Sequence, residues 1–225
     1  GNIFVSRGQE SLPHETEYLA RIWTGFRQTL SWYSKETECD FYDLKGSVEA
    51  FLNSLGISGT DFTRLQPKLC TYTQPGYTAQ ILLDKQPAGL IGELHPKVLS
   101  NFGLKQKLFL FELDLSLISL HISDSIQYKP IPKYPFISRD ITVILNHNVE
   151  ARSILKVLNS IENELIESAD LTNVFEGEPI PEGKKSVSLR ITYRSREKTL
   201  EDTDVTPLTE KIAHRLMDEL GATLP

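Results

Sequence analysis

The chain has 225 residues, of which 40% are hydrophobic and 24% are charged, a balance typical of a soluble globular protein that buries its own core. The formal net charge of −6 excludes a surface coated with basic residues, so any contact with nucleic acid has to come from a local basic patch. No segment approaches the roughly 18 uninterrupted apolar residues of a membrane span, no signal peptide opens the chain, and the start at Gly1 without a methionine indicates a fragment of a longer protein.

The first part of the chain has the mixed pattern of an α+β domain. Leu19, Ile22 and Phe26 recur at helical spacing and predict an early helix, and two strand-like runs around a short connector predict a hairpin. In chain order we expect a helix over residues 16–32, a helix over 44–55 ended by Gly56, strands over 78–83 and 88–94, a helix over 96–102 closed by Gly103, and a strand over 107–113.

Three prolines, Pro130, Pro132 and Pro135, fall within six residues of one another. Proline fixes φ, lacks an amide donor and pushes the preceding residue toward extended structure. We therefore expect an extended linker and a domain boundary near residue 128, with one domain over residues 1–128 and a second over residues 129–225.

The second part has a more regular order of elements. We expect a strand over residues 140–145, a helix over 155–165, strands over 171–175 and 187–193, a helix that begins with a capping box at 199–202 and ends at Gly221, and a last strand that begins at 222–224. The order β-α-β-β-α-β predicts a ferredoxin-like sandwich, in which the helices cover one face of the sheet and the other face stays open.

Positive charge gathers on one strand of this second part and at its ends. Residues 184–198 hold six basic residues and one acid, whereas the region from residue 130 onward has 12 basic and 16 acidic residues. Alternation places Arg190 and Arg194 on the open face, and Phe175 has the parity to lie there too. Guanidinium groups engage phosphates and a flat side chain stacks on an unpaired base, so this face is a candidate RNA-binding surface. A solvated strand with ordinary surface arginines is the alternative, and spacing alone favours it.

The sequence offers no catalytic or metal-binding constellation. It contains neither a G-x-x-x-x-G-K-[ST] loop nor a G-x-S-x-G elbow, and its five histidines are scattered. Cys39 and Cys70 lie far apart, which favours free thiols in a reducing compartment. Gly89 and Gly92 lack the third glycine of a dinucleotide-binding fingerprint, and close backbone packing explains them better.

Several motifs of the chain resemble those of one known family. Residues 136–142 (FISRDIT), 173–186 (NVFEGEPIPEGKKS), 194–200 (RSREKTL) and 220–222 (LGA) resemble the ferredoxin-fold anticodon-binding domain that closes the beta chain of bacterial phenylalanine–tRNA ligases. Residues 41–46 (FYDLKG), 92–96 (GELHP) and 111–115 (FELDL) are similar to the catalytic-like domain of the same beta chain. The resemblance implies a class II synthetase-like antiparallel-sheet domain that has lost its active site, followed by the ferredoxin-like sandwich.

The resemblance also implies roles for single residues. In this family the open sheet face reads the first anticodon base, and Thr142, Asn173, Phe175 and Ser186 match its contact positions. An acid is common where Asn173 stands, and its loss removes a charge-assisted acceptor for a guanine edge; a tyrosine is common where Phe175 stands. In the first domain, residues 74–77 (QPGY) replace the usual His-Pro-Gly-Arg. The expected RNA-binding residues are Thr142, Asn173, Phe175, Ser186, Arg190 and Arg194.

The leading hypothesis is a non-catalytic portion of a cytoplasmic phenylalanine–tRNA ligase beta chain, which supports a catalytic alpha chain and binds the anticodon region of tRNA. ATP and Mg²⁺ belong, on this reading, to the assembled hetero-oligomer, and the fragment itself needs no cofactor. The alternative is a ferredoxin-like regulatory module that binds an amino acid in a pocket between its helices. An independent enzyme would need catalytic residues that the sequence does not offer.

Overall fold

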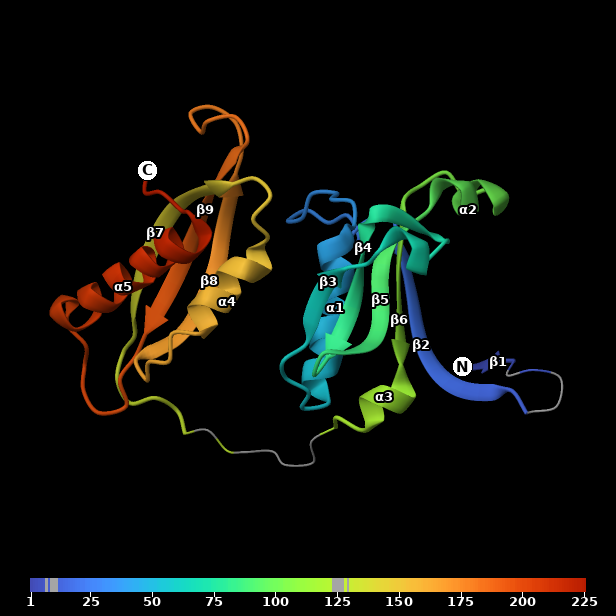
Figure 1. The fold of residues 1–225 in the computed structure, drawn as a ribbon, viewed down its shortest axis with the longest axis horizontal. Helices are drawn as coiled ribbons and strands as arrows, with labels where there is room; N and C mark the ends of the chain where they lie inside the picture. Colours follow the sequence, from blue (N-terminus) through green and yellow to red (C-terminus); the bar gives the residue numbers. More distant parts are fainter. Residues whose placement is uncertain (7, 9–11, 123–127, 129) are drawn as a thin grey trace. The chain divides into compact units, whose positions relative to one another are not determined.

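Two separate β-sheets organise the chain in the computed structural model, which describes residues 1–6, 8, 12–122, 128 and 130–225. Each sheet belongs to one of two units, Gly1–Tyr128 and Lys129–Pro225 (Figure 1). Each unit has an apolar core of its own, so the two are described one after the other.

The sheet of the first unit is antiparallel and has the strand order β1-β2-β6-β5-β4-β3. Its strands are β1 (Asn2–Val5), β2 (His14–Thr24), β3 (Asp61–Arg64), β4 (Thr73–Leu83), β5 (Gln86–Leu94) and β6 (Leu108–Asp114). Its helices are α1 (Phe41–Ser54), α2 (Pro96–Asn101) and α3 (Leu115–Ser119), with a 3-10 turn at Pro67–Leu69.

Helix α1 covers one face of this sheet and closes its core. Leu44, Val48 and Leu52 recur at helical spacing and are fully buried against strand residues such as Ile81 and Ile91. The helix begins at the N-cap Asp40, whose side chain accepts hydrogen bonds from the amides of residues 42 and 43, which satisfies donors that the first turn leaves unpaired. The second expected helix is therefore confirmed, although it begins three residues earlier than predicted.

The first expected helix is wrong, because residues 14–24 form strand β2. Residues 18–24 pair with residues 108–114 of β6. A helix would have placed Leu19, Ile22 and Phe26 on one face. The strand instead turns Leu19 and Trp23 toward the core, while Ile22 lies 65% exposed. Helical spacing was coincidental here, and the backbone hydrogen bonds offered by β6 decided the structure.

The predicted hairpin, short helix and last strand of the first unit are confirmed with shifts at their ends, whereas β1, β3 and α3 were not predicted. The hairpin of β4 and β5 turns at Asp84 and Lys85, whose φ angles of 46° and 68° are those of a two-residue turn that matches the twist of the strands. Gly89 of β5 lies opposite Leu113 of the neighbouring strand β6, and a Cβ atom there would lie 2.1 Å from the carbonyl oxygen of Glu112. Close backbone packing, as expected, accounts for this glycine.

The second unit is an α+β sandwich whose three-stranded antiparallel sheet has the order β7-β9-β8. Its elements are β7 (Ile137–Asn146), α4 (Ala151–Asn159), β8 (Ile166–Phe175), β9 (Lys184–Tyr193) and α5 (Asp202–Leu220). Both helices lie on the same side of the sheet (Figure 1). Alternate residues of β7 and β9 pack with residues of α4 and α5 in one core. The β-α-β-β-α order of the predicted ferredoxin-like fold is thus confirmed.

Three details of this unit differ from the expectation. The last strand is reduced to a bridge, in which Thr223 and Ile144 exchange two backbone hydrogen bonds of 2.7 and 2.9 Å. Helix α4 ends at Asn159, because the side chain of Asn163 accepts from the amide of Leu165 in a local turn. The N-cap of α5 is Glu201 rather than Thr199, and its amide donates to the carboxylate of Asp204 (2.9 Å).

Substitution of Gly89 by alanine tests the close backbone packing of β5 against β6. Gly89→Ala forces a shift of the Glu112 backbone, and overpacking of this kind costs about 1–3 kcal/mol. Gly46→Ala is the matched control, because a Cβ atom there has nothing within 4 Å and alanine stabilises a helix interior by up to about 1 kcal/mol. In urea denaturation, the midpoint should be lower for Gly89→Ala and higher for Gly46→Ala than for the unchanged protein. Equal midpoints would contradict the close packing of β5 against β6.

Candidate nucleic-acid interface

The face of the second sheet that lies opposite α4 and α5 carries a level row of small polar residues and one aromatic ring. Thr142, Ser188 and Asn173 are directly opposite one another across the three strands, and Ile144, Ser186 and Phe175 form the neighbouring row. Directly opposite residues project from the same face of an antiparallel sheet. These residues are called the platform below: Thr142, Ile144, Asn173, Phe175, Ser186 and Ser188.

A β-bulge in β8 sets the orientation of Asn173 and Phe175. Leu171 lies opposite the buried Leu189, and Asn173 already lies opposite Ser188, so Thr172 is an extra residue between them. The hydroxyl of Thr172 donates to the carbonyl oxygen of Ser188 (3.1 Å). An extra residue reverses the alternation of a strand from that point on, and it thereby turns Asn173 and Phe175 away from the core.

The platform is accessible and polar around its ring. The Phe175 side chain is 45% exposed and Asn173 is exposed, while the hydroxyls of Thr142 and Ser188 share a hydrogen bond of 3.0 Å. Val174, next to Phe175 in the chain, is 46% exposed but lies opposite the buried Val187. Two neighbours of equal exposure therefore point to opposite faces of the sheet.

Arg190 lies on the platform face but is already paired. Its guanidinium donates two hydrogen bonds of 2.8 Å to the carboxylate of Asp140 on β7, and Asp170 lies directly opposite it on β8. The hydrogen bonds from Arg190 hold the pKa of Asp140 below its ordinary value. The row of Asp140, Arg190 and Asp170 therefore has one more negative than positive charge, so the face is less cationic than the strand alone suggested.

Arg194 contacts the segment that leads into β7. It donates to Glu167 (2.9 Å) and to the carbonyl oxygen of Tyr134 (3.1 Å), and its guanidinium lies 5.4 Å from the centre of the Phe136 ring. Its side chain is only 23% exposed. These contacts hold the segment that leads into β7 to the start of β8, and a role for Arg194 in RNA binding stays a prediction.

Lys184 is a platform-side cation that the expected set of contact residues left out. It lies opposite Asn146, two residues before Ser186 on β9, and it is exposed. Among the residues that the structure describes, no ion pair engages it. It also lines a surface depression beside the β8–β9 loop, where Nδ1 of His147 lies 3.1 Å from the carboxylate of Glu176 and the amide of His147 donates to the carbonyl oxygen of Gly183 (2.9 Å).

The structure therefore gathers four of the six expected contact residues and separates two. Thr142, Asn173, Phe175 and Ser186 lie on the platform, Arg190 lies beside it in an ion pair, and Arg194 lies beyond its end. Sequence reasoning missed Ser188 and Ile144, although both share the parity of residues already chosen on β9 and β7. It also missed the partners Asp140 and Glu167, which come from other strands and leave no local signal.

The described part of the chain contains no group of three or more His, Cys, Asp or Glu residues able to hold a metal ion. No helix within the described ranges is long and apolar enough to cross a membrane.

Comparison with known proteins identifies both units. The family model of the phenylalanyl tRNA synthetase beta chain CLM domain matches residues 1–115, and that of the ferredoxin-fold anticodon binding domain matches residues 132–225. Curated relatives named phenylalanine–tRNA ligase beta subunit include those of Syntrophus aciditrophicus (38% identical over 99% of this chain), Geobacter metallireducens (35% over 97% of this chain) and Listeria monocytogenes (33% over 100% of this chain). The chain spans 27–28% of the length of these relatives. It belongs to the phenylalanyl-tRNA synthetase beta chain family, and its second unit is a ferredoxin-fold anticodon-binding domain.

Proposed function

We propose that this chain is the non-catalytic, C-terminal portion of a phenylalanine–tRNA ligase beta chain and that its platform binds the anticodon region of tRNA. The observation that carries the proposal is the placement of Phe175: an exposed ring on an open sheet face, level with hydroxyl and amide groups. An unpaired base that stacks on this ring brings its edge to the polar groups beside it.

The neighbours of Phe175 supply the means to read a base. The Asn173 amide offers both a donor and an acceptor, and the hydroxyls of Ser186 and Thr142 each offer both. Stacking is tolerant of sequence because every base has a π-face, whereas hydrogen bonds to the base edge discriminate. Affinity and discrimination are thus assigned to different atoms of the same surface.

Phosphate contacts fall to the cations at the margin of the platform. Lys184 is exposed and two residues from Ser186, so it is available to the backbone of a bound nucleotide. Arg190 has to share its guanidinium with Asp140 or exchange that partner for a phosphate. Each phosphate that a free cation neutralises adds to the affinity and to its salt dependence. Because Arg190 is already paired with Asp140, we expect the electrostatic contribution to RNA binding to be weak.

The first unit, in this proposal, packs against a catalytic alpha chain in the cytoplasm. ATP and Mg²⁺ belong, in this proposal, to the assembled enzyme rather than to this part of the beta chain. The relatives are named beta subunits, which supports a partnership with an alpha chain.

An amino-acid regulatory module is the second candidate, and it needs a pocket between the helices. The space between α4, α5 and the sheet is instead filled by core side chains, with Ile154, Leu158, Ile212 and Leu216 all at most 4% exposed. Parallel titrations with phenylalanine and with the anticodon stem-loop separate the two candidates, because each predicts saturable binding of only one ligand.

Truncation of the ring tests the platform directly. Phe175→Ala should weaken binding of the cognate anticodon stem-loop by about 1–3 kcal/mol, or roughly 5- to 150-fold, because one stacked base loses its support. Val174→Ala is the control, since Val174 has the same exposure on the opposite face and should leave affinity unchanged. Fluorescence anisotropy with a labelled stem-loop gives both values, and equal effects of the two substitutions would exclude the platform.

Removal of the carboxylate that pairs with Arg190 tests the electrostatic contribution to RNA binding. Asp140→Asn removes the carboxylate that holds the guanidinium, so affinity should rise several-fold and the slope of log K against log salt should steepen by about 0.7, the value for one added contact to a single strand. Asp170→Asn removes the same charge without freeing a bidentate partner. It should leave the slope unchanged, and an identical slope in both variants would contradict the idea.

A carboxylate at position 173 tests base reading. Asn173→Asp supplies a charge-assisted acceptor for the two donors of a guanine edge, so it should favour a stem-loop with guanosine as the first anticodon base over one with adenosine. We expect a gain in this ratio of about tenfold, from a hydrogen bond to a charged group. Competition binding with the two stem-loops measures the ratio, and an unchanged ratio would remove Asn173 from the reading site.

A further inference from the structure

The open face of the second unit extends beyond its three strands, because the C-terminal segment pairs with the outer edge of β7. Thr223 and Ile144 exchange backbone hydrogen bonds of 2.7 and 2.9 Å in an antiparallel bridge. Two residues that exchange both bonds lie directly opposite each other, and their side chains project from the same face. Ala222 is buried in the core (5% exposed), so the next residue of an extended chain points to the other face. Thr223 therefore lies on the platform side.

The bridge completes a level row that is four strands wide. Phe175, Ser186 and Ile144 are opposite one another across β8, β9 and β7, and Thr223 is the fourth member of the row. Neighbouring strands lie about 4.8 Å apart, so the row spans about 14 Å. RNA-binding sheets of four strands hold two or three splayed bases. With one base on Phe175, the far end of the row has room for another. Ile144 and Thr223 are called the outer pair below.

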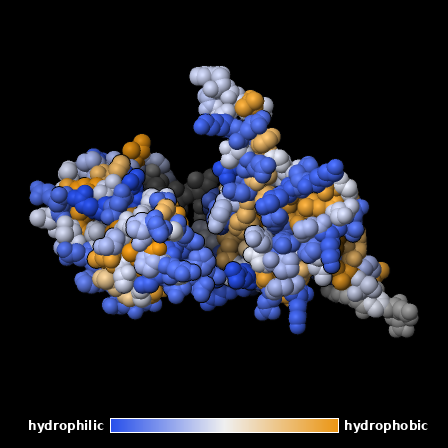
Figure 2. Space-filling view, turned by 90° about the horizontal axis from the view of Figure 1, so that it is seen from above, coloured by the Kyte–Doolittle hydropathy of each residue, from blue (hydrophilic) through white to orange (hydrophobic). Residues whose placement is uncertain are grey.

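Ile144 offers an apolar surface that the core does not use. Its neighbours Val143 and Leu145 are fully buried, whereas Ile144 is half-buried and is not among the described residues that pack against the core of this unit. Single apolar residues at a surface are common, and Figure 2 shows them scattered between hydrophilic ones on both units. The position of Ile144 is what distinguishes it, because the hydroxyl-bearing residues Ser186 and Thr223 flank it in the row. Each hydroxyl can donate and accept a hydrogen bond beside an apolar seat for a base.

The strand between the two ends of the row carries donors for a phosphate. Ser186 of β9 lies between Phe175 and Ile144, and the exposed Lys184 lies two residues away on the same face. Lysine and serine side chains are frequent donors to phosphate oxygens. A strand with one base at each end of the row passes its linking phosphate over β9, where these donors lie. The order ring, cation, apolar seat therefore matches the order base, phosphate, base.

We propose that the outer pair binds the base next to the one that stacks on Phe175, in the same unpaired RNA strand. Ile144 contacts the flat face of this neighbouring base, and the hydroxyl of Thr223 forms a hydrogen bond to its edge. The inference rests on the proposed function and extends it from one base to two. It also makes the C-terminal residues of the chain part of the recognition surface.

The first test measures affinity for the intact anticodon stem-loop with the 225-residue chain. Ile144→Ala should weaken binding by about tenfold, because apolar contact with a base is lost. Thr223→Val keeps the shape and the backbone bridge but lacks the hydroxyl, and it should weaken binding by about fivefold. Leu155→Ala is the matched control: it truncates a 36% exposed apolar side chain on α4, on the opposite side of the sheet, and should change affinity by less than about twofold.

Stem-loops that lack a single base show which base each side chain contacts. One loop lacks the base at the first anticodon position, and two others lack the base before it or the base after it. The losses caused by Ile144→Ala and Thr223→Val should vanish on one of these two flanking loops and persist on the other. The loss caused by Phe175→Ala should vanish only on the loop that lacks the first anticodon base. Such non-additivity isolates a direct contact, and the flanking loop that shows it gives the direction of the strand.

Nuclear magnetic resonance of labelled isoleucine methyl groups gives a readout that needs no substitution in the measured protein. A base over Ile144 should move its δ1 methyl signal upfield when the intact stem-loop is added. The shift should be missing with the flanking loop that abolishes the effect of Ile144→Ala. The spectrum of Ile144→Val identifies the signal.

Three results would each overturn the inference: unchanged affinity of Ile144→Ala for the intact loop, a loss that persists on both flanking loops, or an Ile144 methyl signal that does not move. Failure of the proposed function looks different. In that case the unchanged chain does not bind the stem-loop, or Phe175→Ala has no effect on binding. A chain in which Phe175→Ala weakens binding and Ile144→Ala does not keeps the proposed function and loses only the second base.

Discussion

The orientation of the platform depends on one extra residue in β8. Leu171 is turned to the core, and strict alternation from Leu171 would carry Asn173 and Phe175 to the same side. That register would turn the Asn173 amide to the core side of the sheet, opposite Val187, where the polar atoms that lose water cost free energy unless they are paired. The bulge at Thr172 avoids this cost and leaves Val174 opposite Val187 on the core side. A ring that would otherwise be core material is thereby placed beside polar groups at the surface.

The sequence predicted which residues share the platform better than it predicted their charge. Face is a local property wherever a strand alternates regularly, and alternation from Val174, which lies opposite the buried Val187, gives the observed face of Asn173 and Phe175. Alternation from Leu171, across the bulge at Thr172, gives the wrong face for both. Pairing is not local: Asp140 reaches Arg190 from 50 residues away, and Glu167 reaches Arg194 from 27. A count of basic residues along β9 therefore overstated the positive charge that this face presents, because it could not include carboxylates contributed by β7 and β8.

The same difference between local sequence signals and contacts with distant residues explains which elements of the fold were predictable. Helix α5, with Val205, Ile212 and Leu216 at regular spacing and Gly221 in the left-handed conformation at its end, carries its own signals. Strand β2 does not, because Leu19, Ile22 and Phe26 fit a helix as well as a strand, and only the register with β6 decides between them. The end of α4 was missed for a related reason, since Ile161 and Leu165 still pack on the core after the helix has stopped.

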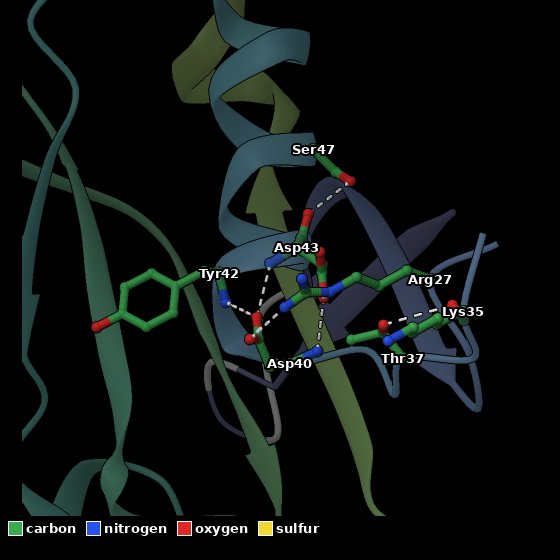
Figure 3. A network of polar contacts seen from close by, with 7 residues as sticks. All are labelled: Arg27, Lys35, Thr37, Asp40, Tyr42, Asp43 and Ser47. Carbon is green, nitrogen blue, oxygen red and sulfur yellow. Dashed lines mark hydrogen bonds and ion pairs between the residues drawn. The ribbon is translucent and has the colours of Figure 1, made fainter. Parts of the chain in front are cut away.

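Two exposed aromatic sites with different surroundings follow from these folds. Phe175 stands among hydroxyls and an amide with the free cation Lys184 at its margin, and this combination suits a ligand that has a flat face, hydrogen-bonding edges and negative charge. Trp32 and Tyr33, in the loop between β2 and α1, stand between uncharged serines, with the exposed Lys35 beside them, while Arg27 at the base of that loop is paired with Asp40 and Asp43 (Figure 3). The groups around a ring, rather than the ring itself, therefore determine which ligand an exposed aromatic site suits.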